Sequence, residues 1–127
     1  MSEPIRVSDA LVALRPGAEW NITGNVYEGI EWLDKNQSLP TEEQVTAKMK
    51  ELTDAKPMKL LREERNKRIA ETDWTQLKDI DLDIIRERNW KNYRQALRDL
   101  PAKSNPKLNE YGDLDMTSVS WPDKPST

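Results

Sequence analysis

The helical part of the fold is decided by two short stretches, Thr72-Asp73-Trp74-Thr75-Gln76-Leu77 and Tyr93-Arg94-Gln95-Ala96-Leu97-Arg98-Asp99-Leu100-Pro101. Trp90 precedes the tyrosine of the second stretch by about one helical turn. Both stretches combine large apolar side chains with charged ones at helical spacing, and neither contains catalytic chemistry. The pattern therefore indicates a small packed helical unit that has a polar face for binding another protein.

Residues 58–101 are predicted to form a helical hairpin, two antiparallel helices joined by a connection that contains Trp74. Asp81 or Asp83 is expected to cap the second helix and Pro101 to end it. The opposite, solvent-facing side of this helix is predicted to carry Arg86, Glu87, Lys91, Arg94 and Arg98. Its apolar stripe is predicted to be Ile85, Asn89, Tyr93, Ala96, Leu97 and Leu100, with Trp90 on the flank.

A preceding helix is predicted to begin after Thr41, because Thr41 and Gln44 have the spacing of a capping box. Pro57 is expected to kink this helix or to begin a new one, since proline has no backbone N–H. Upstream, Ser8 is predicted to cap a short helix over residues 9–14. Residues 18–33 alternate in the manner of a β-hairpin, in which Gly29 indicates a bulge. The face of this hairpin that carries Trp20 and Trp32 requires a cover, because isolated hairpins are marginal in water.

The expected fold is α+β and mainly α: a small N-terminal helix and β-hairpin, a helical hairpin, and an extended C-terminal tail. The corresponding segments are residues 1–40, an N-terminal module, residues 41–101, a helical region, and residues 102–127, a proline-containing tail. Tyr111 and Trp121 are candidate anchors for that tail.

Composition excludes most enzyme classes. The 127 residues contain no Cys and no His, which rules out thiol or imidazole catalysis, Cys/His zinc sites and disulfides. Asp79, Asp81 and Asp83 have a calcium-loop spacing, but the loop's glycine and final glutamate are missing, which favours helix capping. With four Gly there is no phosphate-cradling loop. We expect no enzyme activity, no cofactor and no metal.

The net charge is −3, and basic residues outnumber acidic ones in residues 58–101, where the two signs alternate. Alternating charges predict a solvated helix surface, so nucleic-acid binding is not expected. No run approaches the roughly 20 apolar residues of a membrane helix, and the N-terminus has no signal-peptide pattern. We expect a protein without membrane partners that acts in the cytoplasm.

The aromatic residues comprise five Trp, three Tyr and no Phe, a choice that favours interfaces. Trp74, Trp90 and Tyr93 are expected to form the core of the helix pair rather than direct anchors for a partner. Helix packing does not explain Arg94, which has no favourable interaction with the helix dipole. Two acceptors for it are equally favoured: Asp73 within the chain, or a carboxylate of a partner.

The residues now assembled resemble a known family. The run Arg62-x-x-Arg65-Asn66-x-x-Ile69-x-x-Thr72-Asp73-Trp74-Thr75-Gln76-Leu77, followed by Trp90-x-x-Tyr93-Arg94-Gln95-Ala96-Leu97-Arg98-Asp99-Leu100-Pro101, is similar to the signature of phage tail assembly chaperones. The ending Trp121-Pro122-x-x-Pro125 is similar too, and the resemblance covers residues 58–125. Around Trp20 and Trp32 the chain also resembles a leader found beside this motif in phage proteins. The family usually has a proline after Gln-Leu, where this chain has Lys78-Asp79-Ile80-Asp81.

The resemblance implies a non-enzymatic chaperone or adaptor that binds a phage tail-fibre or tail protein in the host cytoplasm and aids its folding, trimerisation or attachment. The alternatives are a permanent structural component of the tail fibre or baseplate, retained in the virion, and, less favoured, a small nucleic-acid-binding regulator. The expected partner-binding residues are Trp74, Trp90, Tyr93, Arg94, Arg98, Trp20, Trp32 and Trp121.

Overall fold

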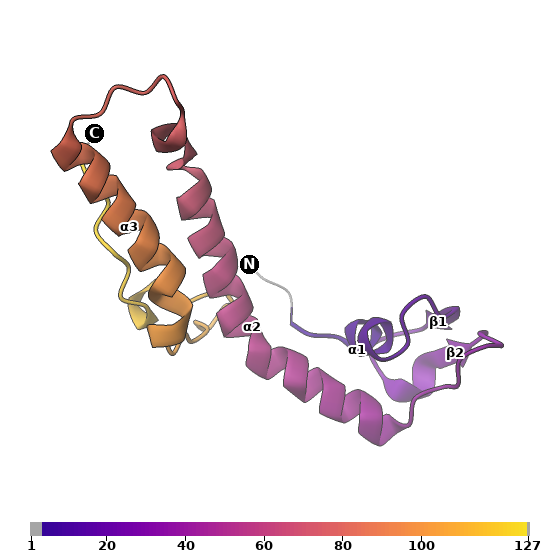
Figure 1. The fold of residues 1–127 in the computed structure, drawn as a ribbon. Coiled ribbons are helices and arrows are strands. Elements are labelled where there is room, and N and C mark those ends of the chain that lie inside the picture. Colours follow the sequence, from indigo (N-terminus) through magenta and orange to yellow (C-terminus); the bar gives the residue numbers. More distant parts are fainter. Residues whose placement is uncertain (1–3, 127) are drawn as a thin grey trace. The chain divides into compact units, whose positions relative to one another are not determined.

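The computed structural model describes residues 4–126, which form three α-helices and one two-stranded antiparallel sheet. The predicted class, α+β and mainly α, is confirmed (Figure 1). The chain divides into two compact units, Ser2–Lys56 and Pro57–Thr127, and the boundary between them lies within the long helix α2, Glu42–Ala70. The first is called the N-terminal unit below, and the second the C-terminal unit.

Helix α1, Val7–Leu14, starts two residues before the predicted position. The prediction that Ser8 caps it was wrong: Arg6 occupies the N-cap position, and Asp9 accepts a hydrogen bond from the backbone N–H of Arg6 at 2.8 Å. A carboxylate in the first helical turn satisfies an otherwise unpaired donor and interacts favourably with the helix dipole. The aspartate therefore defines the helix start in place of the serine.

The predicted β-hairpin is confirmed, with shorter strands than expected. Strands β1, Trp20–Ile22, and β2, Ile30–Trp32, pair so that Trp20 lies opposite Trp32. The predicted bulge at Gly29 was wrong, because Gly29 ends a 3-10 turn that leads into β2. A side chain at this position would collide with the carbonyl oxygen of Thr23, so the close approach of two backbone segments explains the glycine.

The tryptophan face of the hairpin is covered from within the N-terminal unit. Half-buried Trp20 and Trp32 pack on a buried cluster formed by α1 and the start of α2: Val7, Ala10, Leu11 and Val45. The indole N–H of Trp32 donates to the carbonyl of Gln37 at 2.8 Å, and the hydroxyl of Tyr27 donates to the carbonyl of Pro40 at 2.7 Å. Trp32 and Tyr27 thus pack their rings on the core and still satisfy their polar atoms.

Helix α2 begins as predicted, directly after Thr41. Thr41 and Gln44 form the expected capping box, in which each side chain bonds the backbone N–H of the other residue, at 2.9 and 3.1 Å. Pro57 was expected to kink this helix or to begin a new one, and the second alternative was wrong, since α2 runs through the proline as one 29-residue helix. An interior proline costs about 3 kcal/mol, and we attribute its tolerance to the buried side chains before and after it, Val45 and Leu61.

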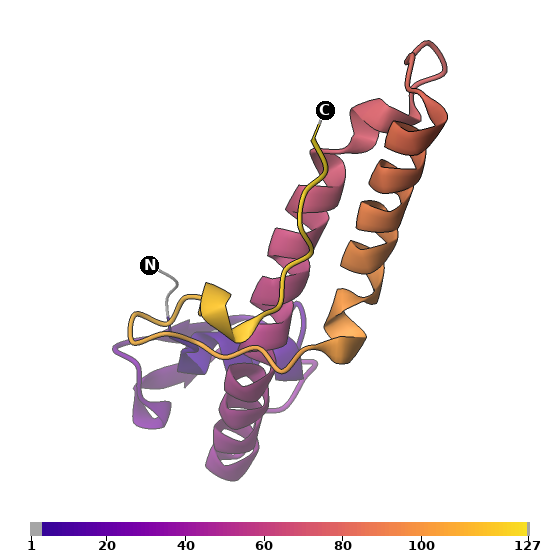
Figure 2. The ribbon, with the colours of Figure 1, turned by 90° about the vertical axis from the view of Figure 1, so that its left-hand side faces the viewer.

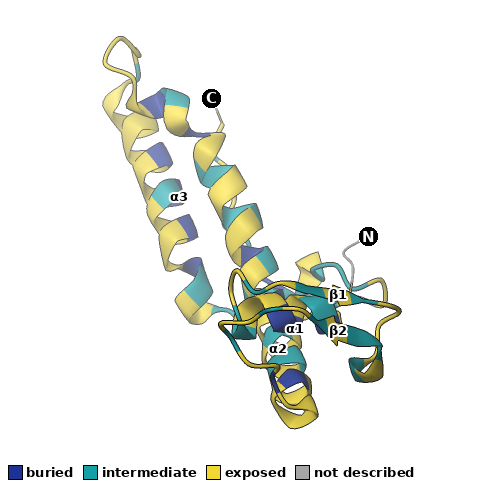
Figure 3. Cartoon of the chain, turned by 90° about the vertical axis from the view of Figure 1, so that its right-hand side faces the viewer, coloured by how far each residue is buried: buried dark blue, intermediate teal, exposed yellow. Residues whose placement is uncertain are grey.

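Helix α3, Ile84–Lys103, is capped by Asp83, which accepts from the N–H of Arg86 at 2.7 Å, as predicted. The prediction that Pro101 ends it was wrong; the helix continues to Lys103, and the Ser104 hydroxyl caps the carbonyl of Leu100 at 2.7 Å. The predicted stripe was wrong at three of its six positions, and Trp90 belongs to the stripe rather than to its flank. The buried residues are Trp90, Tyr93, Leu97 and Leu100, whereas Ile85, Asn89 and Ala96 are exposed (Figure 3).

The second half of α2 and α3 lie side by side as the predicted helical hairpin (Figures 1 and 2). Figure 2 also shows the tail returning along the helix pair. Val119, in this tail, is buried against Leu61 and Leu100, and Trp121 contacts this cluster and the one around Trp90. Trp121 anchors the tail as expected, whereas Tyr111 is exposed in a turn. None of the helices described is both long and apolar enough to cross a membrane.

Candidate partner-binding site

An aromatic cluster closes the end of the helical hairpin at which α2 and α3 are connected. Trp90, 1% exposed, lies between Trp74 and Tyr93, with ring centroids 5.3 and 6.0 Å away and both ring pairs edge-to-face at 75°. Such pairs add about 0.5–1.5 kcal/mol each beyond the area they bury. Trp74 comes from the 3-10 helix Asp73–Gln76, so the cluster fixes the connection on α3.

Arg94 is held within the chain. Its side chain is 12% exposed, and Nη1 donates to the Thr72 hydroxyl at 2.6 Å, to Asp73 Oδ1 at 3.1 Å and to the Ile69 carbonyl at 3.4 Å. The sequence predicted either Asp73 or a carboxylate of a partner as the acceptor for Arg94, and in the structure the acceptor is Asp73. Three acceptors, from the end of α2 and the start of the connection, converge on one guanidinium, so Arg94 holds the connection on α3 together with the aromatic cluster.

Arg98, one turn further along α3, is different because its side chain is exposed. Its Nη1 donates to Gln95 Oε1 at 3.3 Å, and Gln95 in turn donates to Asp99 Oδ1 at 3.0 Å. Between residues 4 and 126 it has no carboxylate within 4.0 Å. The row Gln95, Arg98 and Asp99 is therefore a polar surface whose cation is available to a partner.

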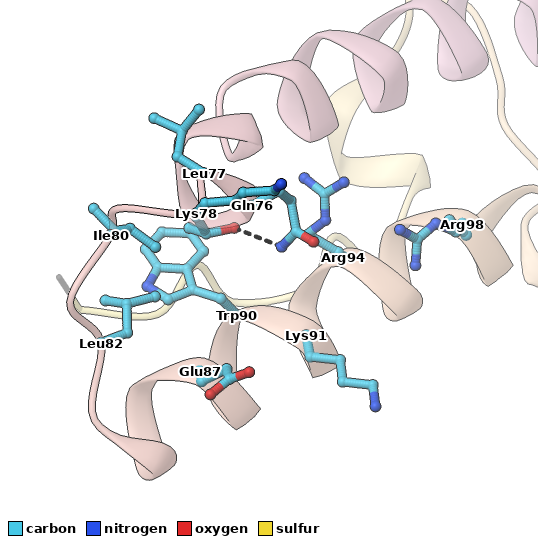
Figure 4. Close-up of a pocket in the computed structure, with 11 residues that line it drawn as sticks. Gln76, Leu77, Lys78, Ile80, Leu82, Glu87, Trp90, Lys91, Arg94 and Arg98 are labelled. Atoms are coloured by element: carbon cyan, nitrogen blue, oxygen red, sulfur yellow. Dashed lines mark hydrogen bonds between the residues drawn. The ribbon is translucent and has the colours of Figure 1, made fainter.

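A pocket of about 500 Å³ opens beside this cluster and extends along α3 (Figure 4). Its lining residues are Thr75, Gln76, Leu77, Lys78, Ile80, Leu82, Glu87, Trp90, Lys91, Arg94 and Arg98. Figure 4 shows the apolar side chains Ile80 and Leu82 beside the indole of Trp90, Leu77 directed away from the ring, and the guanidinium groups further along the helix. One end of the pocket is apolar and the other is basic.

Exposed apolar side chains surround the apolar end. Leu77, Ile80, Ile84 and Ile85 are 62%, 38%, 72% and 66% exposed, and all fall within nine consecutive residues. Sequence reasoning assigned Ile85 to the core and did not single out the other three. The sequence does contain a signal for this exposure. Trp90, Tyr93, Leu97 and Leu100 alone form a complete apolar stripe at helical spacing, and this pattern predicts that Ile84 and Ile85 lie outside the buried face.

A second contact surface lies where the tail crosses α2. The guanidinium of Arg68 lies 4.0 Å from the ring centroid of Trp121, while its Nε pairs with Glu64 Oε1 at 3.0 Å. A cation over an indole face adds about 0.5–2 kcal/mol, so this contact helps to hold the tail on the helix pair. The predicted residue Trp121 thus lies beside Tyr93 in the same unit.

The structure brings six of the eight predicted residues together in the C-terminal unit: Trp74, Trp90, Tyr93, Arg94, Arg98 and Trp121. Trp20 and Trp32 belong to the core of the N-terminal unit and contribute nothing to this pocket. Within the described part of the chain, no group of three or more acidic residues is arranged to hold a metal ion. The chemistry offered by the site is that of apolar contact, hydrogen bonding and positive charge.

Comparison with known proteins agrees with the boundaries of this unit. The model of one family, described as phage tail assembly chaperone protein, matches residues 58–126. No curated protein and no solved structure shows a significant match. The match spans more than half of the chain, covers the helical hairpin with its tail, and begins one residue after the start of the C-terminal unit. The chain therefore belongs to the phage tail assembly chaperone protein family.

Proposed function

We propose that this protein is a non-catalytic chaperone or adaptor that binds a phage tail-fibre or tail protein and aids its folding, trimerisation or attachment. Family membership supports a role in tail assembly, which takes place in the infected host cell. The observation that carries the more specific proposal is the exposed apolar surface of residues 77–85 at the closed end of the helical hairpin. Exposed apolar groups concentrated beside a pocket are typical of protein-binding surfaces.

The mechanism follows from what the surface offers. A newly made fibre subunit exposes apolar surface and unpaired strand edges until its own trimer interface forms, and such surfaces aggregate. Leu77, Ile84 and Ile85 would cover part of that surface, while the aromatic cluster beneath them keeps the connection rigid. A rigid apolar surface loses little conformational entropy on binding, which favours a specific and reversible complex.

In this proposal, the burial and the contacts of each remaining predicted residue determine its role. Trp74, Trp90 and Tyr93 organise the surface from below, Arg94 holds the connection, and Arg98 contacts the partner directly. Trp121 keeps the tail in place beside them. Trp20 and Trp32 provide additional docking through the edges of their half-buried rings in the N-terminal unit.

Co-expression with the tail-fibre protein of the same phage tests the proposal. We expect soluble, trimeric fibre protein with the wild-type chain, and aggregated fibre protein with the L77S/I84S/I85S variant. The matched control is V12S/V26S, which removes exposed apolar side chains from the N-terminal unit and should leave assembly intact. Fibre protein that is soluble and trimeric without this chain would refute the chaperone role.

Departure from the finished particle is part of the proposal, because a chaperone surface is released once the fibre's own interface has formed. Mass spectrometry of purified particles should therefore find the chain at far below the copy number of the fibre. Stoichiometric presence would instead identify a permanent component of the fibre or baseplate.

A further inference from the structure

The basic end of the pocket has positive charge that the chain itself does not neutralise. Lys78, Lys91 and Arg98 line it together with a single carboxylate, Glu87. In the described range, none of these three cations has an acidic group within 4.0 Å, although Glu87 lies one turn before Lys91 on the same helix. Converging cations in a concave surface attract anions and form strong charge-assisted hydrogen bonds with carboxylates.

The apolar end of the same pocket favours a ligand that has an apolar group as well as a negative charge. Leu77, Ile80 and Leu82 line this end, and Ile80 and Leu82 lie beside the Trp90 indole (Figure 4). A small inorganic anion would leave these side chains in water, whereas a bulky aliphatic side chain would bury them at about 25 cal/mol per Å². The pocket therefore fits a ligand that presents an apolar group and an acidic group close together.

Trp90 adds a third feature, an unmet hydrogen-bond donor. Its indole Nε1 is buried and has no acceptor within residues 4–126, whereas the indole of Trp32 in the N-terminal unit donates to a backbone carbonyl. A buried donor without an acceptor costs about 1–3 kcal/mol. A peptide carbonyl brought in by a partner, with a small shift of the segment around Leu82, would offset that cost.

We infer that this pocket captures an acidic and apolar peptide segment of the tail protein, with a Glu or Asp side chain adjacent to a Leu-like one. The inference rests on the proposed function and specifies its ligand. The aliphatic side chain would lie among Leu77, Ile80 and Leu82, and the carboxylate would bond Lys91 and Arg98. A peptide fits better than a nucleic acid, because a nucleic acid has no aliphatic side chain to place at the apolar end. The whole chain is also acidic, with a net charge of −3, which disfavours binding to phosphates.

The test uses the full-length chain, labelled with ¹⁵N, and two peptides blocked at both ends, Gly-Leu-Glu-Leu-Asp-Gly and its neutral counterpart Gly-Leu-Gln-Leu-Asn-Gly. We expect the acidic peptide to bind at least tenfold more tightly and to shift the indole N–H resonance of Trp90. The K91Q/R98Q variant should weaken that binding by about tenfold or more. Equal binding of both peptides, or binding that leaves the Trp90 resonance unmoved, would overturn the inference.

Two controls make these outcomes specific. R62Q/R88Q removes the same charge from exposed positions on α2 and α3 that do not line the pocket, and should bind like the wild type. A single-stranded thymidine oligonucleotide should not bind at physiological salt. If it displaces the acidic peptide and shifts the Trp90 resonance equally, the pocket recognises anions in general and the peptide assignment fails.

The inference and the proposed function fail in different ways. If K91Q/R98Q supports fibre assembly as well as the wild type does, the chaperone role stands and the pocket is not its binding site. If the wild-type chain does not support assembly, the chaperone role fails, and the peptide titration still decides what the pocket binds.

Discussion

The two units of this chain bury tryptophan in different ways. In the N-terminal unit, Trp20 and Trp32 lie on a hairpin face that α1 and α2 cover, and the indole of Trp32 donates to a carbonyl 2.8 Å away. In the C-terminal unit, the indole N–H groups of Trp90 and Trp121 are buried without an acceptor in the described chain. The N-terminal unit gives the Trp32 indole an acceptor, whereas the C-terminal unit leaves two buried indole N–H groups without one.

The two units also differ in how their exposed apolar side chains and charges are distributed. The C-terminal unit concentrates four exposed aliphatic side chains within residues 77–85, next to a pocket with uncompensated cations. The N-terminal unit spreads its exposed apolar residues along the chain, at Val12, Val26, Leu33 and Leu39. Unmatched donors and concentrated apolar surface are typical of binding sites, so the difference supports the proposal that the C-terminal unit binds the partner.

The largest expected effect on the difference between the two units comes from removing the indole ring of Trp90. Trp90→Ala should destabilise the C-terminal unit by about 3–5 kcal/mol, because it empties the space between Trp74 and Tyr93. Chemical denaturation followed by NMR should show resonances of Trp74 and Trp121 lost at lower denaturant than those of Trp20 and Trp32. Simultaneous loss of all four would show that the units do not unfold separately.

Gly29→Ala should destabilise the N-terminal unit instead. Its methyl group would meet the backbone carbonyl of Thr23, and the hairpin must open to admit it, at a cost of about 3 kcal/mol. Tryptophan fluorescence during thermal unfolding measures the loss. Glu31→Ala, at an exposed position of β2, is the control and should change stability by less than about 0.5 kcal/mol.

Arg94→Leu should destabilise the C-terminal unit by about 2 kcal/mol, since the guanidinium joins three acceptors at the connection. The matched change one turn away, Arg98→Leu, should cost less than about 0.5 kcal/mol because that side chain is exposed. Urea denaturation measures both variants. Equal costs would contradict the distinction between a structural Arg94 and a partner-facing Arg98.

The smallest predicted effect is a pH dependence of the hairpin. Hydrogen bonds from the backbone N–H groups of Gln37, Glu19 and Asn36, the first being strongest, lower the pKa of Asp34 below its ordinary value. The ionised form is therefore favoured by folding, and its stabilisation is present above the unfolded pKa and lost as pH falls through the folded one. The melting temperature of wild type should fall more than that of Asp34→Asn between pH 6 and about 3. Parallel curves would contradict this role.

Local signals predicted much of the fold. The capping box at Thr41 and Gln44, the cap at Asp83, and the alternation around Trp20 and Trp32 each report short-range physics, and the structure has all three. The misplaced features depend on tertiary packing. Pro57 and Pro101 discourage a helix locally, yet the chain stays helical through both, and Leu61 and Leu100 pack in the core close to these prolines.

The candidate site was predictable in its residue types and less so in its arrangement. Trp74, Trp90 and Tyr93 were identified from their spacing, but Trp90 was assigned to the flank because the stripe was counted from Ile85, which is exposed. The pocket combines residues of a connection with those of α3, and helical periodicity cannot place a connection. The burial of Val119 in the tail escaped prediction for the same reason, since Val119 belongs to no periodic segment.

Hydrogen–deuterium exchange of the full-length chain, alone and bound to its tail or fibre protein, tests most directly whether the C-terminal unit carries the binding function. The backbone of residues 77–91 contains the exposed apolar side chains and most of the pocket. We predict that exchange in this segment slows on complex formation, and that it slows more than exchange in residues 7–32, where Trp20 and Trp32 give only additional docking. Protection confined to residues 7–32, with residues 77–91 unaffected, would contradict the assignment of the site.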